Sequence, residues 1–79
     1  MQKSVKIFTT STCAYCKMVK EFFKQNNINY EEKDVVMDMQ AREEMINKSG
    51  QMGVPVIFVG DDIVIGFDKS RLSELLGVK

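Results

Sequence analysis

Residues 5–16 read VKIFTTSTCAYC and place two cysteines between a strand-like segment and a helix-like segment. Cys13 and Cys16 are the only cysteines of the chain. Thiols three positions apart can close a small disulfide ring and reopen it without a change in the rest of the fold. A thiol at a helix N-terminus also faces unpaired N–H groups and the positive end of the helix dipole, which favours the thiolate. The stretch therefore predicts thiol–disulfide exchange.

The composition describes one small domain. The chain has 79 residues, of which 44% are hydrophobic and 28% charged, and its eleven basic residues balance eleven acidic ones. A net charge of zero gives no attraction to nucleic acid or to an anionic membrane. No apolar stretch approaches the length of a membrane span, and the N-terminus lacks the features of a secretory signal. We expect a single cytoplasmic domain over residues 1–79, where a cysteine pair is more often catalytic or metal-binding than structural.

Outward from the cysteines, the apolar spacing predicts the element order β-α-β-α-β-β-α. The predicted strands cover residues 4–9, 29–36, 55–59 and 63–65, and the predicted helices cover residues 13–25, 39–48 and 69–76. The first β-α-β unit should be parallel, with a right-handed crossover, and a turn at Gly60-Asp61 should join an antiparallel hairpin. We expect an α/β fold in which helices cover both faces of a four-stranded mixed sheet.

Two expectations concern side-chain packing. The helix after the cysteines should bury one apolar stripe, formed by residues that recur at helical spacing. These residues are Tyr15, Met18, Val19, Phe22 and Phe23. The six methionines are expected to act as soft core packing, with Met52 as the one exception because it lies close to Pro55.

The two thiols should have different roles. Cys13 lies at the junction of loop and helix, so we expect it to be the attacking thiolate. Cys16 lies one turn further on and points toward the apolar stripe, so it should resolve the mixed disulfide. Lys17 is four residues after Cys13 and can add positive charge near its sulfur. Tyr15 either flanks a bound thiol substrate or packs at the edge of the core.

Metal binding is the alternative from a different class. A zinc site needs four ligands, and this chain has two cysteines and no histidine. A metal or iron–sulfur site would therefore need a dimer that shares two cysteine pairs. A pair of inert, buried cysteines is a further alternative.

The sequence resembles the glutaredoxins, which have the thioredoxin fold. The resemblance covers almost the whole chain and rests on FTTSTCAYC (residues 8–16), AREEMI (41–46), GVP (53–55) and GFD (66–68). The family active site usually reads Cys-Pro-Tyr-Cys, and here Ala14 replaces the proline. The resemblance implies a cis peptide between Val54 and Pro55 beside the cysteines, which exposes the Val54 backbone to a substrate. From the residues alone, Pro55 could equally be a proline at the entry of a strand.

The resemblance also implies a substrate-binding set. Glutaredoxins hold glutathione with a basic residue before the active site, a basic or amide residue before the cis-proline, and a Gly-Cys/Ser/Thr-Asp turn. The first position here is Thr10, which has no charge, and Lys69 follows the turn where many bacterial members have an acid. The implied binding residues are Gln51, Val54, Gly66, Phe67 and Asp68. Phe67 as a core anchor and Asp68 as a simple N-cap are the structural alternatives.

Gly66-Phe67 is similar to a second group, the NrdH-type redoxins, which accept electrons from thioredoxin reductase and supply ribonucleotide reductase. Their motif has Trp-Ser before this pair and Arg-Pro after it, where this chain has Val64-Ile65 and Asp68-Lys69. We therefore expect a monomeric, glutaredoxin-like oxidoreductase that reduces protein or glutathione mixed disulfides. Its reductant would be glutathione or thioredoxin reductase, with no bound cofactor and no metal.

Overall fold

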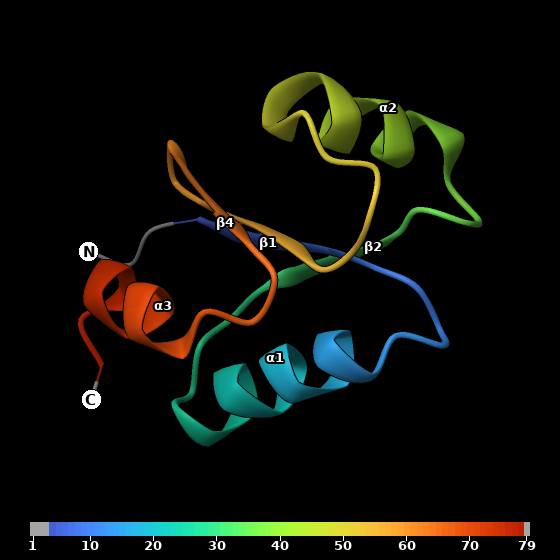
Figure 1. Cartoon of the computed structure of the whole chain (residues 1–79). Coiled ribbons are helices and arrows are strands. Elements are labelled where there is room, and N and C mark those ends of the chain that lie inside the picture. The colour runs from blue at the N-terminus through green and yellow to red at the C-terminus, as the bar shows by residue number, and fades with distance from the viewer. Residues whose placement is uncertain (1–3, 79) are drawn as a thin grey trace.

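The computed structural model of the chain describes residues 4–78, and the element order in this range confirms the predicted one (Figure 1). Each element begins and ends within a few residues of its predicted bounds. The strands are β1 (Val5–Thr9), β2 (Glu31–Asp34), β3 (Val56–Val59) and β4 (Asp62–Ile65), and the helices are α1 (Ala14–Gln25), α2 (Met39–Ser49) and α3 (Lys69–Leu76).

The four strands form one mixed sheet in the order β2-β1-β3-β4. β1 runs parallel to β2, whereas β3 is antiparallel to both β1 and β4. The end of β1 is therefore level with the end of β2, the start of β3 and the end of β4, because Phe8 pairs with Lys33 and Val56, and Val56 pairs with Ile65. We call this side of the sheet the site edge. In Figure 1 the loops after β1 and β2 and the loop before β3 lie on the side of the molecule away from both termini.

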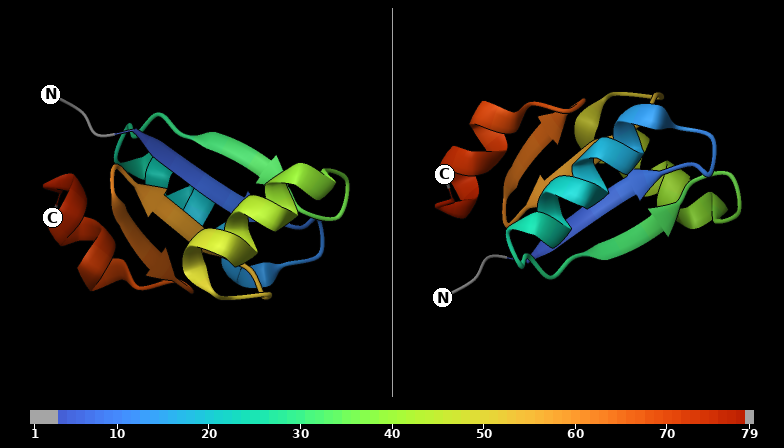
Figure 2. Two further views of the ribbon diagram at one scale, coloured as in Figure 1. Left: turned by 90° about the horizontal axis from the view of Figure 1, so that it is seen from above. Right: turned by 90° about the horizontal axis from the view of Figure 1, so that it is seen from below.

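Helices cover both faces of the sheet, as predicted. Figure 2 shows α2 across one face in the view from above and α1 across the other face in the view from below. The larger core lies between the sheet, α1 and α3, and consists of Val5, Ile7, Val19, Phe22, Phe23, Ile57, Val59, Val64 and Leu72. The smaller core lies under α2 and consists of Phe8, Val35, Ala41, Met45 and Val56.

Capping residues fix the ends of α2. The Asp38 carboxylate accepts a hydrogen bond of 3.1 Å from the Ala41 N–H, as expected for an N-cap. Gly50 ends the helix with φ 72°, a left-handed conformation that glycine adopts without steric cost. Asp38 thus fixes where α2 begins after β2, and Gly50 fixes where α2 ends before β3.

The second strand is shorter than predicted. Residues 29–36 were expected to be extended, and only Glu31–Asp34 form β2. Val35 still donates a 3.0 Å backbone bond to Thr9. The Asp34 carboxylate then accepts bonds from the N–H groups of Val36 at 2.9 Å and Met37 at 3.2 Å. This local side-chain pairing competes with the sheet ladder and turns the chain away from it.

The predicted apolar stripe is wrong at two positions. The buried residues of α1 are Cys16, Val19, Phe22 and Phe23, while Tyr15 and Met18 are exposed. Each exposed residue immediately precedes a buried one, and one residue rotates the side chain by about 100° around the helix. The stripe is therefore narrower than the sequence spacing suggested.

The expectation for the methionines is also wrong. Among the five that the structure describes, Met45 is fully buried, whereas Met18, Met37, Met39 and Met52 are exposed. Met39 is two residues before the buried Ala41, which places it on the opposite side of α2. Of these five methionines, Met45 alone acts as core packing.

No helix within residues 4–78 has the length and apolar character needed to cross a membrane.

Candidate redox site

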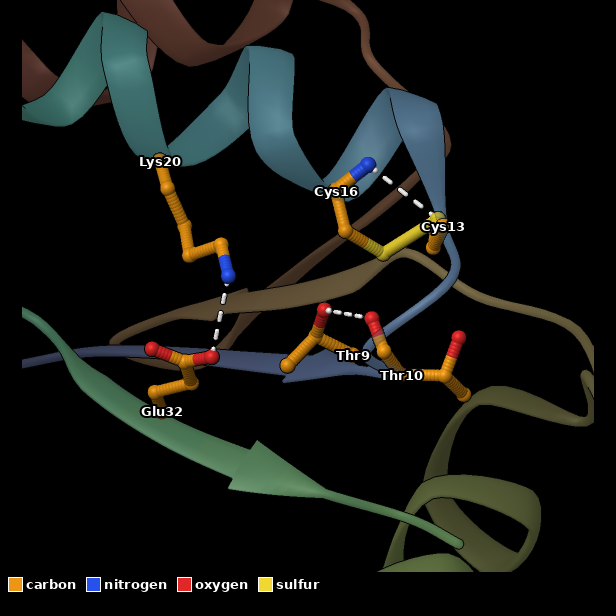
Figure 3. Close-up of a disulfide and its surroundings, with 6 residues drawn as sticks. All are labelled: Thr9, Thr10, Cys13, Cys16, Lys20 and Glu32. Atoms are coloured by element: carbon orange, nitrogen blue, oxygen red, sulfur yellow. Dashed lines mark hydrogen bonds and ion pairs between the residues drawn. A yellow bond between two sulfur atoms is a disulfide. The ribbon is translucent and has the colours of Figure 1, made fainter.

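Cys13 and Cys16 form a disulfide at the N-terminus of α1, with their Cα atoms 5.2 Å apart (Figure 3). Cys13 is the N-cap residue of the helix, and its Sγ accepts a 3.1 Å hydrogen bond from the Cys16 N–H. The Cys13 N–H in turn donates to the Thr10 carbonyl at 3.4 Å. A sulfur atom thus occupies the place where a capping oxygen usually lies, facing the positive end of the helix.

The two sulfurs differ in exposure. Cys13 is partly exposed, whereas Cys16 is fully buried. The difference follows from the helix, because Cys13 precedes its first turn and Cys16 lies on the side that faces the sheet. A substrate can therefore approach Cys13, and Cys16 is placed to react with the sulfur of Cys13 alone.

Tyr15 and Lys17 project outward next to the disulfide. The Tyr15 side chain is 63% exposed, and Lys17 is exposed as well. Within residues 4–78, Lys17 has no ion-pair partner. The structure thus allows Tyr15 to flank a substrate and Lys17 to add charge near Cys13, and both roles stay predictions.

The peptide bond between Val54 and Pro55 is cis. Pro55 is buried and Val54 is half-buried. The Pro55 carbonyl accepts a 2.9 Å bond from the Gly66 N–H, which joins the loop before β3 to the turn after β4. Because both segments lie at the site edge, the structure brings the predicted residues 54, 55 and 66 together on the side of the sheet that carries the cysteines.

The turn after β4 gives its side chains structural roles. Gly66 has φ 77°, a left-handed conformation. Phe67 packs against the larger core, with its ring centroid 6.2 Å from that of Phe22. The Asp68 carboxylate caps α3 by accepting a 3.1 Å bond from the Arg71 N–H. Gln51 is exposed in the loop before β3. A substrate-binding role for these residues stays a prediction.

Metal-binding side chains do not gather near the cysteines. Within residues 4–78, no group of three or more histidine, cysteine, aspartate or glutamate side chains could hold a metal ion. The iron–sulfur hypothesis involves two chains, so it stays a prediction.

Sequence reasoning missed the exposed apolar residues after β2. Val36, Met37 and Met39 lie at the site edge and are exposed. The sequence did contain a signal for the turn that carries them. Asp34 and Asp38 are both residue types that bond to nearby backbone N–H groups, which favours a turn over a continued strand at this point.

Comparisons with known proteins agree on one family. The family model for glutaredoxin matches residues 5–64. An uncharacterised glutaredoxin-like 8.6 kDa protein from the rubredoxin operon of Clostridium pasteurianum is 43% identical over 72 residues, covering 91% of this chain and 96% of that protein. Glutaredoxin 3 of Escherichia coli is 34% identical over 65 residues, covering 82% of this chain and 78% of that protein.

Solved structures agree with the sequence relatives. A mutant of the thioredoxin-like protein BC3987 has a TM-score of 0.92 at 32% identity, covering 98% of this chain and 99% of that one. A glutaredoxin from Archaeoglobus fulgidus has a TM-score of 0.84 at 29% identity, covering 92% and 85%. The mixed sheet, the N-terminal cysteine pair of α1 and these matches together show that the chain belongs to the glutaredoxin family and has the thioredoxin-like fold.

Proposed function

We propose that this protein is a dithiol electron carrier that reduces protein disulfides or glutathione mixed disulfides. The observation that supports it most is the asymmetry of the cysteine pair. Cys13 is partly exposed and its Sγ caps α1, while Cys16 is buried one turn further on. One sulfur can therefore meet a substrate, and the other can react only after the first has done so.

The reaction transfers two electrons in two exchanges. The Cys13 thiolate attacks one sulfur of the substrate disulfide, a new S–S bond forms to Cys13, and the other substrate sulfur leaves as a thiolate. Cys16 then loses its proton and attacks Cys13, which closes the Cys13–Cys16 disulfide and releases the second substrate thiolate. An external dithiol or two glutathione molecules restore both thiols by the reverse exchange. The helix N-terminus stabilises the negative charge of the Cys13 thiolate before it attacks and again when reduction regenerates it.

A trapping experiment tests the assigned roles. The Cys16→Ser protein, mixed with glutathione disulfide, should gain the mass of one glutathione at Cys13, because the resolving thiol is gone. The matched Cys13→Ser protein should gain little, because Cys16 is buried. Equal labelling of the two variants would contradict the roles given to the sulfurs.

The electron donor divides this proposal from a second candidate, a redoxin fed by thioredoxin reductase that supplies ribonucleotide reductase. The turn at residues 66–69 supports this second candidate, because the bulky Phe67 packs against the larger core at the position where glutathione-binding members have a small residue. Oxidised protein should be given excess glutathione in one sample, and thioredoxin reductase with NADPH in another. Fast formation of free thiols with glutathione supports the first candidate, and reduction by the reductase alone supports the second.

A further inference from the structure

β4 is an outer strand of the sheet and consists of Asp62, Ile63, Val64 and Ile65. One side of it pairs with β3, and among the strands of residues 4–78 no other pairs with it. Figure 1 looks onto the other side: β4 is drawn in front of β1 and β2, and no helix of the described chain passes across it in this view. We call this outer side the β4 edge. Its backbone is open to a further strand.

The register shows which backbone groups of β4 point outward. In an antiparallel pair, residues that bond the partner strand alternate with residues whose N–H and C=O groups point away from it. The Gly66 N–H donates to the Pro55 carbonyl at 2.9 Å, so residues 66, 64 and 62 are the ones that bond β3. Ile63 and Ile65 therefore direct their N–H and C=O groups to the β4 edge.

A second hydrogen bond gives the same alternation. The Gly60 N–H donates to the Ser4 carbonyl at 2.8 Å, so Gly60 and every second residue before it on β3 bond β1. The residues between them bond β4, and Ile57, which is one of these, is paired with Val64. Both hydrogen bonds thus leave residues 63 and 65 facing outward.

The β4 edge is complementary to itself. Two copies of the chain can lie antiparallel with Val64 opposite Val64 of the second copy, so that Ile63 of each copy lies opposite Ile65 of the other. Each of these pairs exchanges two N–H···O=C bonds, and the two pairs together use every outward group of Ile63 and Ile65. Because residues 63–65 read Ile-Val-Ile in both directions, apolar side chains of one kind meet at both pairs.

The paired isoleucines would lie on the face of the sheet that α2 covers. Ile63 is the cross-strand neighbour of Phe58 and Ile65 that of Val56, and Val56 belongs to the smaller core under α2. Ile63 is half-buried and Ile65 is 51% exposed. An isoleucine of a second copy beside each of them would bury apolar surface that the single chain leaves in water.

No like charges would face each other in this register. Asp62 would lie opposite Gly66 of the second copy, which carries no side chain. The Asp62 carboxylate also lies 3.9 Å from the Arg71 guanidinium of its own chain. The net charge of the chain is zero, so two copies do not repel each other at long range. A second copy therefore matches this edge in hydrogen bonds, side chains and charge.

The redox site would stay open in such a pair. The strand order is β2-β1-β3-β4, so β3 separates β4 from the strand that leads to Cys13. Because the two copies of β4 run antiparallel, the site edges of the two chains point to opposite ends of the joined sheet. Each Cys13 could thus meet its substrate independently of the other.

We propose that two copies of this chain associate through the β4 edge and join their sheets into one continuous sheet. The inference goes beyond the proposed function and does not depend on it, because the cysteines take no part in the contact. Two short strands bury less surface than the interface of an obligate dimer does, so the association should be weak. The monomer expected from the sequence would then be the form present in dilute solution.

Sedimentation equilibrium of the oxidised protein tests for the association, since the closed disulfide prevents cross-linking through the cysteines. The average mass should rise from that of one chain at about 1 µM toward that of two at about 1 mM, with a dissociation constant on the order of 100 µM. The mass of a single chain throughout this range would overturn the proposal. A mass well above two chains would also contradict it, because each copy has one β4 edge.

Hydrogen exchange at the backbone locates the contact in the unmodified protein. In dilute solution the N–H groups of Ile63 and Ile65 should exchange fast because they point to solvent, whereas that of Val64 should be protected by its bond to β3. At about 1 mM the exchange of Ile63 and Ile65 should slow about fivefold, in proportion to the fraction of chains that are paired. Association without this slowing would place the contact elsewhere and overturn the proposal.

Two double variants test the register. Ile63→Lys/Ile65→Glu places opposite charges at both pairs and should still associate, whereas Ile63→Lys/Ile65→Lys places like charges there and should associate at least about tenfold more weakly. Salt at about 1 M should narrow this difference. Both variants lose the same two isoleucines, so their comparison reports on the pairing itself. Equal association of the two at low salt would contradict the register.

A third variant controls for net charge. Glu21→Gln/Glu43→Gln raises the net charge by the same amount as the double lysine variant, but at exposed positions on α1 and α2. It should associate about as tightly as the wild type, and a loss as large as that of the double lysine variant would contradict the proposal. Reduction of glutathione disulfide by the wild type is measured alongside. Its absence would overturn the proposed function alone, while a wild type that is active and always monomeric would overturn the association alone.

Discussion

The two faces of the sheet are built differently. Among residues 4–78, the face covered by α1 and α3 buries nine residues in the larger core, among them Phe22 and Phe23, whose ring centroids are 6.1 Å apart, and the disulfide lies on this side. The face covered by α2 buries five. There, charged side chains cover aromatic ones, with Lys6 5.8 Å from the Phe8 ring centroid and Lys48 5.7 Å from that of Phe58.

The cysteine pair lies on the face that has the larger core. The reactive sulfur is fixed on the layer with the deeper core, where packing holds the N-terminus of α1 against the sheet. The thinner α2 layer contributes exposed side chains, of which Met37 and Met39 lie at its start.

The largest expected effect is on core stability. Phe23 is fully buried, and its ring centroid is 5.0 Å from that of Tyr30. Phe23→Ala should lower the free energy of unfolding by about 3–5 kcal/mol, and Met45→Ala in the smaller core by about 2–3 kcal/mol, because the aromatic side chain removes more buried volume and apolar surface when it is truncated. Urea unfolding of the oxidised proteins measures both values.

Conservative variants serve as controls for this pair. Phe23→Leu and Met45→Leu keep most of the buried volume and should each cost much less than the alanine variant. If Met45→Ala lowered the free energy of unfolding as much as Phe23→Ala does, the smaller core would contribute as much to stability as the larger one, and the prediction would be wrong.

A smaller effect is expected at the start of α2. Asp38→Ala removes the 3.1 Å bond to the Ala41 N–H and should cost about 1 kcal/mol. Because few buried contacts hold α2, its amide groups should exchange hydrogen faster while those of α1 change little. Asp38→Asn retains a capping oxygen and is the control. Equal acceleration in α1 would show that the two layers open together.

The smallest predicted effect concerns Glu44, which bridges Lys6 at 3.3 Å and Lys48 at 3.3 Å on the α2 face. Partial burial raises its pKa, but the hydrogen bonds and positive charges of Lys48 and Lys6 outweigh burial, so the pKa lies below its ordinary value of 4.5. The ionised form therefore stabilises the folded chain above about pH 4.5, and this contribution disappears as the pH falls through the lower pKa of the folded state.

Glu44→Gln should accordingly cost about 0.5–1 kcal/mol at pH 7 and almost nothing in strong acid, since pairs near the surface are screened by solvent. Unfolding in urea at a series of pH values measures this dependence. The exposed neighbour offers a matched control, because Glu43→Gln should change stability little at any pH. A loss that stays constant down to strong acid would show that charge pairing is not its cause.

Much of the fold could be predicted because local signals agreed with one another. The Gly60-Asp61 turn, the capping residues Asp38 and Asp68, and the glycine stop at Gly50 each marked an element end that the structure confirms. The position of Cys13 before α1 followed from the same reasoning, and so did the burial of Cys16.

The predictions were wrong at the end of β2, where a local hydrogen bond stops the strand, and on α1, where a shift of one position along the helix separates buried from exposed side chains. The Asp34 carboxylate ended β2 early by binding the next two N–H groups, which strand propensity does not reveal. Tyr15 and Met18 lie one position from the buried stripe, so spacing alone could not show that they are exposed. The contact between Gly66 and Pro55 continues the β3–β4 pairing by one step beyond Val56 and Ile65, so it follows from the register of the hairpin, which the turn signal alone did not specify.

The strand β2 has a consequence for how this protein behaves at high concentration. It is an outer strand of the sheet and consists of Glu31, Glu32, Lys33 and Asp34. An outer strand offers unpaired backbone groups to which a strand of another molecule can add, and this is a common start of aggregation. Four consecutive charged residues make such addition costly, because the charges of an arriving identical strand would have to be desolvated and brought together. The protein can thus accumulate without forming fibrils through this edge.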